Sequence, residues 1–229
     1  MLHLLIGSRG SQPKLSHHKL FNYILKLLHI GCQWKEFPLD RDLQDKPEIH
    51  YTRVYRAFRR YEAHICFALI FEMSVLRLHQ KGLVDASVIH GDGTTTVAKK
   101  GGDNLGYSGH KYLKGDKVVA FCDRNCNVIA PFVTVPGNRN ESPRLKNALP
   151  LVMRLARAIG LKLEGSIASL DGIYDSRTSQ KLIFNRGMIP NIPENQRGRK
   201  GSKRGTKQIF DKDMYGNCLR SSHAVWGIQ

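Results

Sequence analysis

The sequence predicts a mixed α/β protein, in which a sheet with flanking helices follows a small helical N-terminal part. Two observations support this fold class. Between residues 19 and 80, apolar residues recur at the three- and four-residue spacing of amphipathic helices. After Gly82 the pattern changes to short β-branched segments bounded by turns, which alternate with helical segments in the order β-β-β-α-β-α-β. Such an order is typical of a mixed sheet with helices packed on it.

The N-terminal part is expected to hold two helices. The first spans residues 19–29, with Ser16 as its N-cap and Gly31 at its end. The second runs from residue 52 to about residue 80 and carries four arginines, largely off its apolar stripe: Arg53, Arg56, Arg59 and Arg60. Arginines on such a helix can bind DNA phosphates or guanine edges. A solvated charged face on an ordinary bundle helix is an equal alternative.

The C-terminal part supplies the predicted sheet. Its expected strands cover residues 88–92, 110–122, 128–135, 165–171 and 188–192. One expected helix covers residues 143–160 and is stopped by Gly160, and a second begins at Ser176 or Thr178 and ends at Asn185. We therefore predict two domains, a helical N-terminal domain at 1–85 and a domain with the sheet at 86–229.

The charge balance predicts a polyanionic partner. The chain has 229 residues, with 36 Lys and Arg against 19 Asp and Glu, a net charge of +17. Nucleic acid is the first expectation and an anionic membrane surface the second, while a basic protein that is merely soluble is a third. The longest apolar run, residues 65–71, is seven residues, too short to cross a membrane. Neither a secretory signal nor a disulfide framework is expected, and the five cysteines fit a reducing compartment.

One segment concentrates positive charge. Residues 195–207 (NQRGRKGSKRGTK) hold six basic residues and no acid, so they cannot bury a core and are predicted to form a mobile basic loop. A solubilising tail is the weaker alternative, because ordered-looking sequence continues on both sides. The residues we expect to contact DNA phosphates here are Arg197, Arg199, Lys200, Lys203 and Arg204.

Two aspartates occupy equivalent places in the predicted sheet. Asp92 and Asp171 each end a strand, and each precedes a glycine. Two carboxylates on neighbouring strand ends repel unless a cation lies between them, and Mg²⁺ suits such a pair together with substrate phosphates. Paired ions of this kind can activate water and stabilise the leaving oxygen of a phosphodiester. The alternative is that Asp-Gly is simply a favoured turn dipeptide.

Four segments of the sequence together resemble a known family. Residues 92–102 (DGTTTVAKKGG) are similar to the first-acid segment of bacterial insertion-sequence DDE transposases of the fifth insertion-sequence family. The similarity continues at 136–142 (PGNRNES) and 170–175 (LDGIYD), while 31–38 (GCQWKEFP) resembles part of the family's helical N-terminal domain. It covers about residues 20–215. It implies that residues 1–85 form a DNA-recognition domain and that residues 86–229 form an RNase H-like catalytic core. In this core three acids hold two divalent metals, with Asp92 as the first acid and Asp171 as the second.

The resemblance also implies a function. A transposase of this kind binds double-stranded DNA at the terminal repeats of its element, cuts it with Mg²⁺ (or Mn²⁺), and joins the freed 3′ end to target DNA. It implies a bacterial, cytoplasmic protein associated with the nucleoid when bound to DNA. Joining two DNA ends is also compatible with an active homodimer.

The third acid departs from the family pattern of Tyr, Arg and Glu. Aligning Tyr215 without gaps puts Cys218 at the Arg and Ser222 at the Glu, and no Glu follows Glu194. Serine has no charge and cannot replace a carboxylate at a metal. We expect either a degenerate or truncated copy or a substitute acid such as Glu141, and the first is favoured. A catalytically inactive DNA-binding remnant is therefore the alternative function, and a nuclease without strand transfer is a third.

Overall fold

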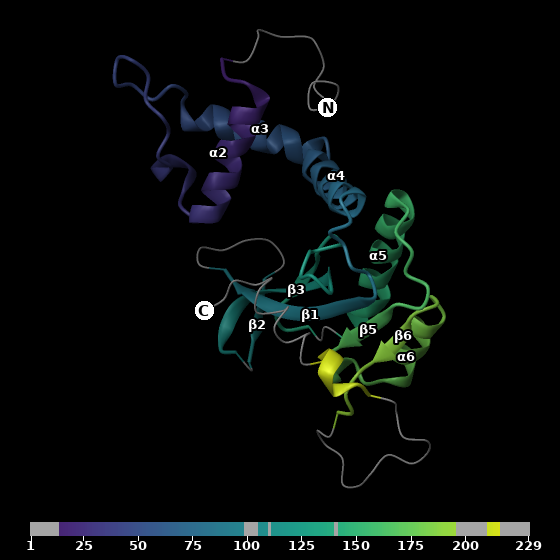
Figure 1. Cartoon of the computed structure of the whole chain (residues 1–229). Helices are drawn as coiled ribbons and strands as arrows, with labels where there is room; N and C mark the ends of the chain where they lie inside the picture. The colour runs from purple at the N-terminus through teal and green to yellow at the C-terminus, as the bar shows by residue number, and fades with distance from the viewer. Residues whose placement is uncertain (1–13, 99–104, 110, 140–141, 196–209, 216–229) are drawn as a thin grey trace. The chain divides into compact units, whose positions relative to one another are not determined.

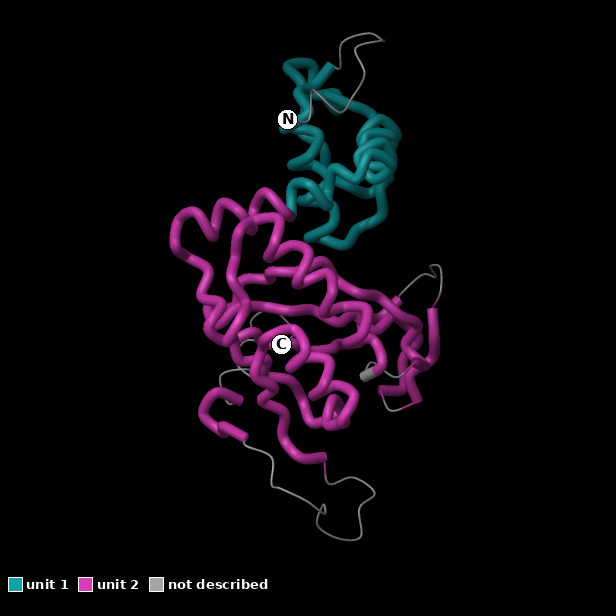
Figure 2. Tube along the Cα trace, turned by 90° about the vertical axis from the view of Figure 1, so that its right-hand side faces the viewer, with its two compact units in different colours: residues 1–71 teal, residues 72–229 magenta. Residues whose placement is uncertain are grey.

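The computed structural model describes residues 14–98, 105–109, 111–139, 142–195 and 210–215 (Figure 1). The chain divides into two compact units, residues 1–71 and 72–229 (Figure 2). The boundary falls inside helix α4 (Cys66–Gln80). The division at residue 85 into DNA recognition and catalysis stays a prediction. No helix in the described part of the chain is long and apolar enough to cross a membrane.

The first unit is built around α2 (His17–Ile30) and α3 (Tyr51–Ala63), with a short 3-10 helix η1 (Trp34–Glu36) between them. Ser16 caps α2 by accepting a hydrogen bond from the Lys19 amide at 3.2 Å, and Gly31 ends it in the left-handed conformation. Both expected signals for this helix are confirmed. Its core is apolar and consists mainly of Leu20, Tyr23, Ile24, Leu27, Val54, Ala57 and Tyr61.

The long helix expected from residue 52 to about 80 is instead two helices. α3 ends at Ala63 and α4 begins at Cys66, with Ile65 between them at φ 50°. A β-branched residue rarely adopts this left-handed conformation. The apolar spacing could not reveal the break, because Tyr61 and Cys66 are both buried on either side of it. A two-residue interruption therefore leaves the helical period almost unchanged.

The polar loop that follows η1 is held to α2 by a charged cluster. The Lys19 ammonium lies 2.7 Å from the Glu48 carboxylate, and the Tyr23 hydroxyl donates to the same carboxylate. The Tyr23 oxygen also accepts a hydrogen bond from the Asp40 amide at 3.2 Å. The ammonium and the phenol both stabilise the ionised carboxylate and lower the pKa of Glu48.

The second unit contains one mixed sheet. Its strands are β1 (Val88–Val97), β2 (Gly106–Ser108), β3 (Leu113–Asp123), β4 (Val133–Pro136), β5 (Ile167–Leu170) and β6 (Ile189–Asn191). The order is β2-β3-β1-β5-β6, and β4 pairs with β3 beyond the end of β2. β1 pairs antiparallel with β3 and parallel with β5, which is parallel to β6. The expected mixed sheet with flanking helices is confirmed.

Helices α5 (Leu145–Ile159) and α6 (Arg177–Phe184) pack against each other, α5 contacting β3 and α6 contacting β6 (Figure 1). Gly160 ends α5 at φ 74°, and Ser176 caps α6 by accepting from the Ser179 amide. The end of α5 at Gly160 and the start of α6 at Ser176 agree with the signals in the sequence. The helix expected from residue 143 begins as the 3-10 turn η2 (Ser142–Arg144) and becomes α-helical only at Leu145. The 3-10 turn η3 (Gly172–Tyr174) was not expected.

The strands differ from the expectation in one respect that affects the site. The first strand was expected to end at Asp92, but β1 continues five residues further, to Val97. It continues because β3 pairs with it along almost its whole length, from Ile89 opposite Asp123 to Val97 opposite Gly115. Asp-Gly in this place is therefore strand rather than turn. The short strand β2 was also missed, since three residues are too few to show alternation.

Candidate active site

The register between β1 and β5 brings the two predicted aspartates together. The last parallel pair is Gly91 on β1 with Leu170 on β5. Asp92 follows Gly91 directly, and Asp171 follows Leu170 directly. Neighbouring strands lie about 4.8 Å apart, so the two side chains start from adjacent points of the sheet. The juxtaposition expected from the sequence thus follows from strand pairing, whereas the catalytic and metal-binding roles of the two residues stay predictions.

The two aspartates reach this point in different ways. Asp92 lies in the middle of β1 and is half-buried, whereas Asp171 follows the end of β5 and is exposed. In both, one carboxylate oxygen accepts a hydrogen bond from the amide of the following glycine: Gly93 at 2.8 Å and Gly172 at 2.6 Å. The two Asp-Gly steps therefore share a local geometry that orients each carboxylate against its own backbone.

A buried polar row crosses the sheet two residues before the aspartates. His90 on β1 is opposite Ser169 on β5, which is opposite Asn191 on β6. Each is at most 4% exposed, and the Asn191 amide donates to the Ser169 hydroxyl at 3.5 Å. Because side chains alternate between faces, His90 and Ser169 share the face of Asp92 and Asp171. Burial lowers the pKa of His90, which keeps this layer uncharged at neutral pH.

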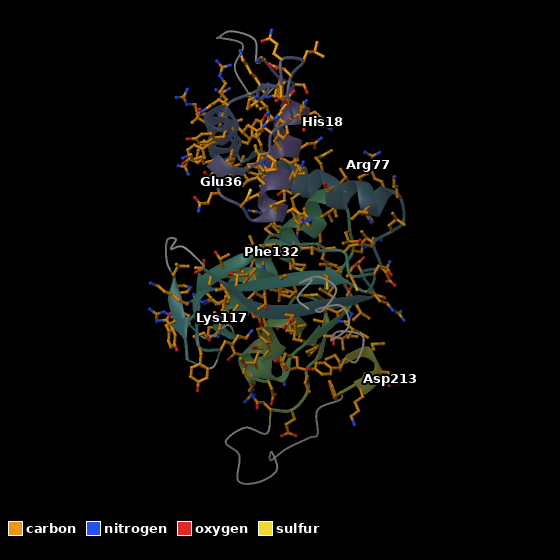
Figure 3. The ribbon with its side chains drawn as sticks, turned by 90° about the vertical axis from the view of Figure 1, so that its left-hand side faces the viewer. His18, Glu36, Arg77, Lys117, Phe132 and Asp213 are labelled. Carbon is orange, nitrogen blue, oxygen red and sulfur yellow. The ribbon has the colours of Figure 1, made fainter. Side chains whose placement is uncertain are left out.

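Asn191 also attaches the C-terminal segment, residues 210–215, to the end of β6. Its side-chain amide accepts from the Asp211 amide at 2.9 Å and donates to the Asp211 carbonyl at 3.1 Å. The Asp211 carboxylate then caps a helical turn by accepting from the amides of Asp213 and Met214. Asp213 is labelled on this turn in Figure 3. One buried amide thus fixes both the position and the start of the segment.

The attached segment carries Tyr215 to the second aspartate. Its hydroxyl donates to Oδ1 of Asp171 at 3.2 Å, and its ring packs edge-on against Phe210 with centroids 5.5 Å apart. The sequence drew attention to Tyr215 only as an alignment marker. Neither this contact nor the role of Asn191 carries a signal in spacing or composition, because both depend on where the segment returns to the sheet.

The donor set fits a divalent ion only in part. Paired carboxylates are hard oxygen donors, and Mg²⁺ binds to one or two of them together with phosphates. Within the described residues, no group of three or more His, Cys, Asp or Glu side chains could hold a metal ion. Glu141 and Ser222, the positions discussed for the third acid, lie outside the described residues, as does Cys218, which aligns with the family's Arg.

The four arginines expected to contact DNA are all exposed on α3. Val54, Ala57 and Tyr61 form the buried side of the helix. Arg53, Arg56 and Arg60 are spaced three and four residues apart and form one stripe, whereas Arg59 forms an ion pair with Glu62 at 2.9 Å. The second predicted basic group, Arg197, Arg199, Lys200, Lys203 and Arg204, lies outside the described residues.

No protein-family model matches the sequence, and no curated protein matches it either. Three solved structures are similar in fold. They are the Mos1 transposase paired-end complex with left transposon end (12% identity, TM-score 0.34), the piggyBac transposase synaptic complex with hairpin DNA (12%, 0.42) and the Mos1 strand transfer complex (14%, 0.32).

The matched regions cover most of this chain but only part of those proteins. The similarity covers 81%, 84% and 81% of this chain, and 61%, 41% and 60% of the respective structures. The chain therefore spans less than two thirds of the length of each. At these identities the similarity concerns the fold alone, a mixed sheet with flanking helices.

Proposed function

We propose that this chain is a DNA transposase of the DDE type, which cuts double-stranded DNA at the ends of an insertion sequence and joins it to target DNA. The observation that supports the proposal best is the register that makes Asp92 and Asp171 neighbours on adjoining parallel strands. Two like charges this close favour a cation between them. Mg²⁺ is the cation proposed, with Mn²⁺ as an alternative.

The residues of the site have separate tasks in this proposal. Asp92 and Asp171 bind the divalent ion, while the Tyr215 hydroxyl holds the Asp171 carboxylate in place. Bound there, the ion supplies an activated water and charge stabilisation for the leaving oxygen of a phosphodiester. His90 is neutral and buried on the same face, two residues before Asp92, so it adds no positive charge that would repel the ion.

The cationic surfaces hold the DNA. The exposed stripe of Arg53, Arg56 and Arg60 on α3 contacts backbone phosphates, as do the basic residues between 197 and 204. The net charge of +17 steers the association with DNA. The reaction brings together two DNA ends, for which we propose a homodimer acting in the bacterial cytoplasm at the nucleoid.

The second candidate function is a catalytically inactive DNA-binding remnant. It is favoured by the serine at position 222, where the family pattern has its third carboxylate. Two carboxylates leave more positive charge at a two-metal site than three, so metal affinity and activity would both fall. In this case the chain binds DNA through the same cationic surfaces and does not cut it.

A nicking assay separates the two functions. Purified full-length protein is incubated with labelled duplex carrying the DNA that flanks its gene, with Mg²⁺, Mn²⁺ or EDTA. The transposase proposal expects metal-dependent nicking that is lost in both Asp92→Asn and Asp171→Asn. A matched control is Glu164→Gln, because Glu164 is exposed and precedes β5, at the other end of that strand from Asp171. Duplex binding without nicking in either metal would overturn the enzyme and support the remnant.

A further inference from the structure

The hairpin formed by β2 and β3 exposes two aromatic rings and two lysines at the end of the sheet. Tyr107 on β2 is 57% exposed, and Tyr112, in the turn before β3, is 82% exposed. Lys111 and Lys114 are also exposed. Large aromatic side chains contribute most when buried, so two of them in solvent beside cations indicate a binding surface.

The register places part of this surface on the same face of the sheet as Asp92. Tyr107 is directly opposite Lys114, and Asp92 is directly opposite Ala120. Lys114 and Ala120 are six residues apart on β3, an even spacing, so their side chains leave the sheet on the same side. At about 3.3 Å per residue, the hairpin lies about 20 Å from the carboxylate pair.

The backbone of Tyr112 supports a role beyond folding. Its φ is 52°, in the left-handed region where a side chain is unfavourable and glycine is preferred. The ring of Tyr112 lies in solvent, so its packing does not explain the conformation. Strained residues that are not explained by packing are concentrated at binding and catalytic sites.

We propose that this hairpin binds an unpaired DNA strand. Bases stack on the rings of Tyr107 and Tyr112, while Lys111 and Lys114 contact the flanking phosphates. Aromatic platforms among cations are the usual means of binding single strands, whereas bases inside a duplex are already stacked on one another. The inference rests on the proposed function in one respect, that the strand continues to the carboxylate pair about 20 Å away.

Fluorescence anisotropy of full-length protein with labelled oligothymidine, in EDTA, tests the proposal. Tyr107→Ala and Tyr112→Ala are each expected to weaken binding about tenfold, as measured for lost base stacking elsewhere. Tyr107→Phe and Tyr112→Phe are expected to bind like the wild type, because phenylalanine stacks as well. Lys114→Ala is expected to reduce the slope of log affinity against log salt by about one.

The controls make the result specific to the hairpin. Phe184→Ala removes another exposed ring, 72% exposed at the end of α6, and should leave the affinity unchanged. Circular dichroism shows whether each variant is folded. The proposal is overturned if the wild type does not bind the single strand, or if Phe184→Ala weakens binding as much as Tyr107→Ala and Tyr112→Ala do. It is also overturned if, with duplex DNA and RNA as further probes, the two alanine variants lose only duplex binding or only RNA binding. Asp171→Asn should retain single-strand binding even where nicking is lost, so failure of the proposed function remains distinguishable.

Discussion

The hydroxyl of Tyr215 donates a hydrogen bond to Oδ1 of Asp171 at 3.2 Å, across 44 positions of sequence. Of the predicted metal-binding pair, Asp171 is the exposed member, and this contact restrains it from outside the sheet.

Removal of this hydroxyl is expected to weaken metal binding. Groups that orient a metal-binding side chain typically change the affinity by about tenfold or more when mutated. Tyr215→Phe keeps the ring against Phe210 and should therefore lower the Mn²⁺ affinity of the full chain about tenfold, measured by isothermal titration calorimetry. Tyr112→Phe is the matched control, because that hydroxyl is far from Asp171 in the fold. Equal Mn²⁺ affinity in Tyr215→Phe and the wild type would contradict the positioning role.

Asn191 is expected to hold the C-terminal segment to the sheet. Its amide makes both hydrogen bonds to the Asp211 backbone, and it is 4% exposed. Asn191→Leu should leave the Asp211 amide and carbonyl without this partner, at a cost of about 2 kcal/mol in the free energy of unfolding. Hydrogen exchange should show faster exchange of the Asp211 amide in the variant, with that of Phe121 in the central sheet unchanged. Unchanged exchange at Asp211 would show that other contacts hold the segment.

Much of the fold was predictable because its signals are local. Ser16, Gly31, Gly160 and Ser176 act at helix ends through their own backbone or side-chain geometry, and each was identified from sequence. The break at Ile65 was missed, since both flanking helices continue one apolar stripe.

The site was predictable only where strand order determines it. Two strands followed by Asp-Gly suggested that Asp92 and Asp171 meet, although β1 in fact continues past Asp92. Tyr215 and Asn191 were missed because their contacts depend on the return path of residues 210–215. Hydrogen bonds between distant segments leave no periodic pattern in a sequence.

The stability of the first unit is expected to fall at acidic pH. The Lys19 ammonium and the Tyr23 hydroxyl lower the pKa of Glu48 in the folded chain. A lowered folded pKa means that the contribution is complete above the unfolded value, about 4.3, and is lost as pH falls through the folded value. Glu48→Gln should therefore reduce the stability difference between about pH 7 and about pH 3 in urea unfolding. Asp42→Asn, in the same loop but without a contact to Lys19, is a control; an unchanged difference in Glu48→Gln would contradict the prediction.

Gly91 is expected to tolerate no side chain. A Cβ at this position would lie 2.4 Å from Cδ2 of Leu170 and 2.7 Å from the ring of Phe121. Gly91→Ala should therefore push β5 away from β1 and lower the free energy of unfolding by about 1–3 kcal/mol. Gly109→Ala is the control, because a Cβ there meets nothing within 4 Å. Thermal unfolding measures both, and equal midpoints would show that the sheet absorbs the added methyl group.

The arginines of α3 are expected to differ in their contribution to DNA binding. Arg56 is exposed on the stripe with Arg53 and Arg60, whereas Arg59 lies 2.9 Å from the carboxylate of Glu62. A phosphate must compete with that carboxylate for Arg59, so the neighbouring negative charge offsets part of the attraction. Arg56→Ala should reduce the slope of log affinity against log salt by about one, and Arg59→Ala by less. Glu62→Gln should tighten duplex binding at low salt by removing the competing charge. Equal effects of Arg56→Ala and Arg59→Ala would instead mean that DNA displaces Glu62, and unchanged binding in both would place the DNA contact away from this face of α3.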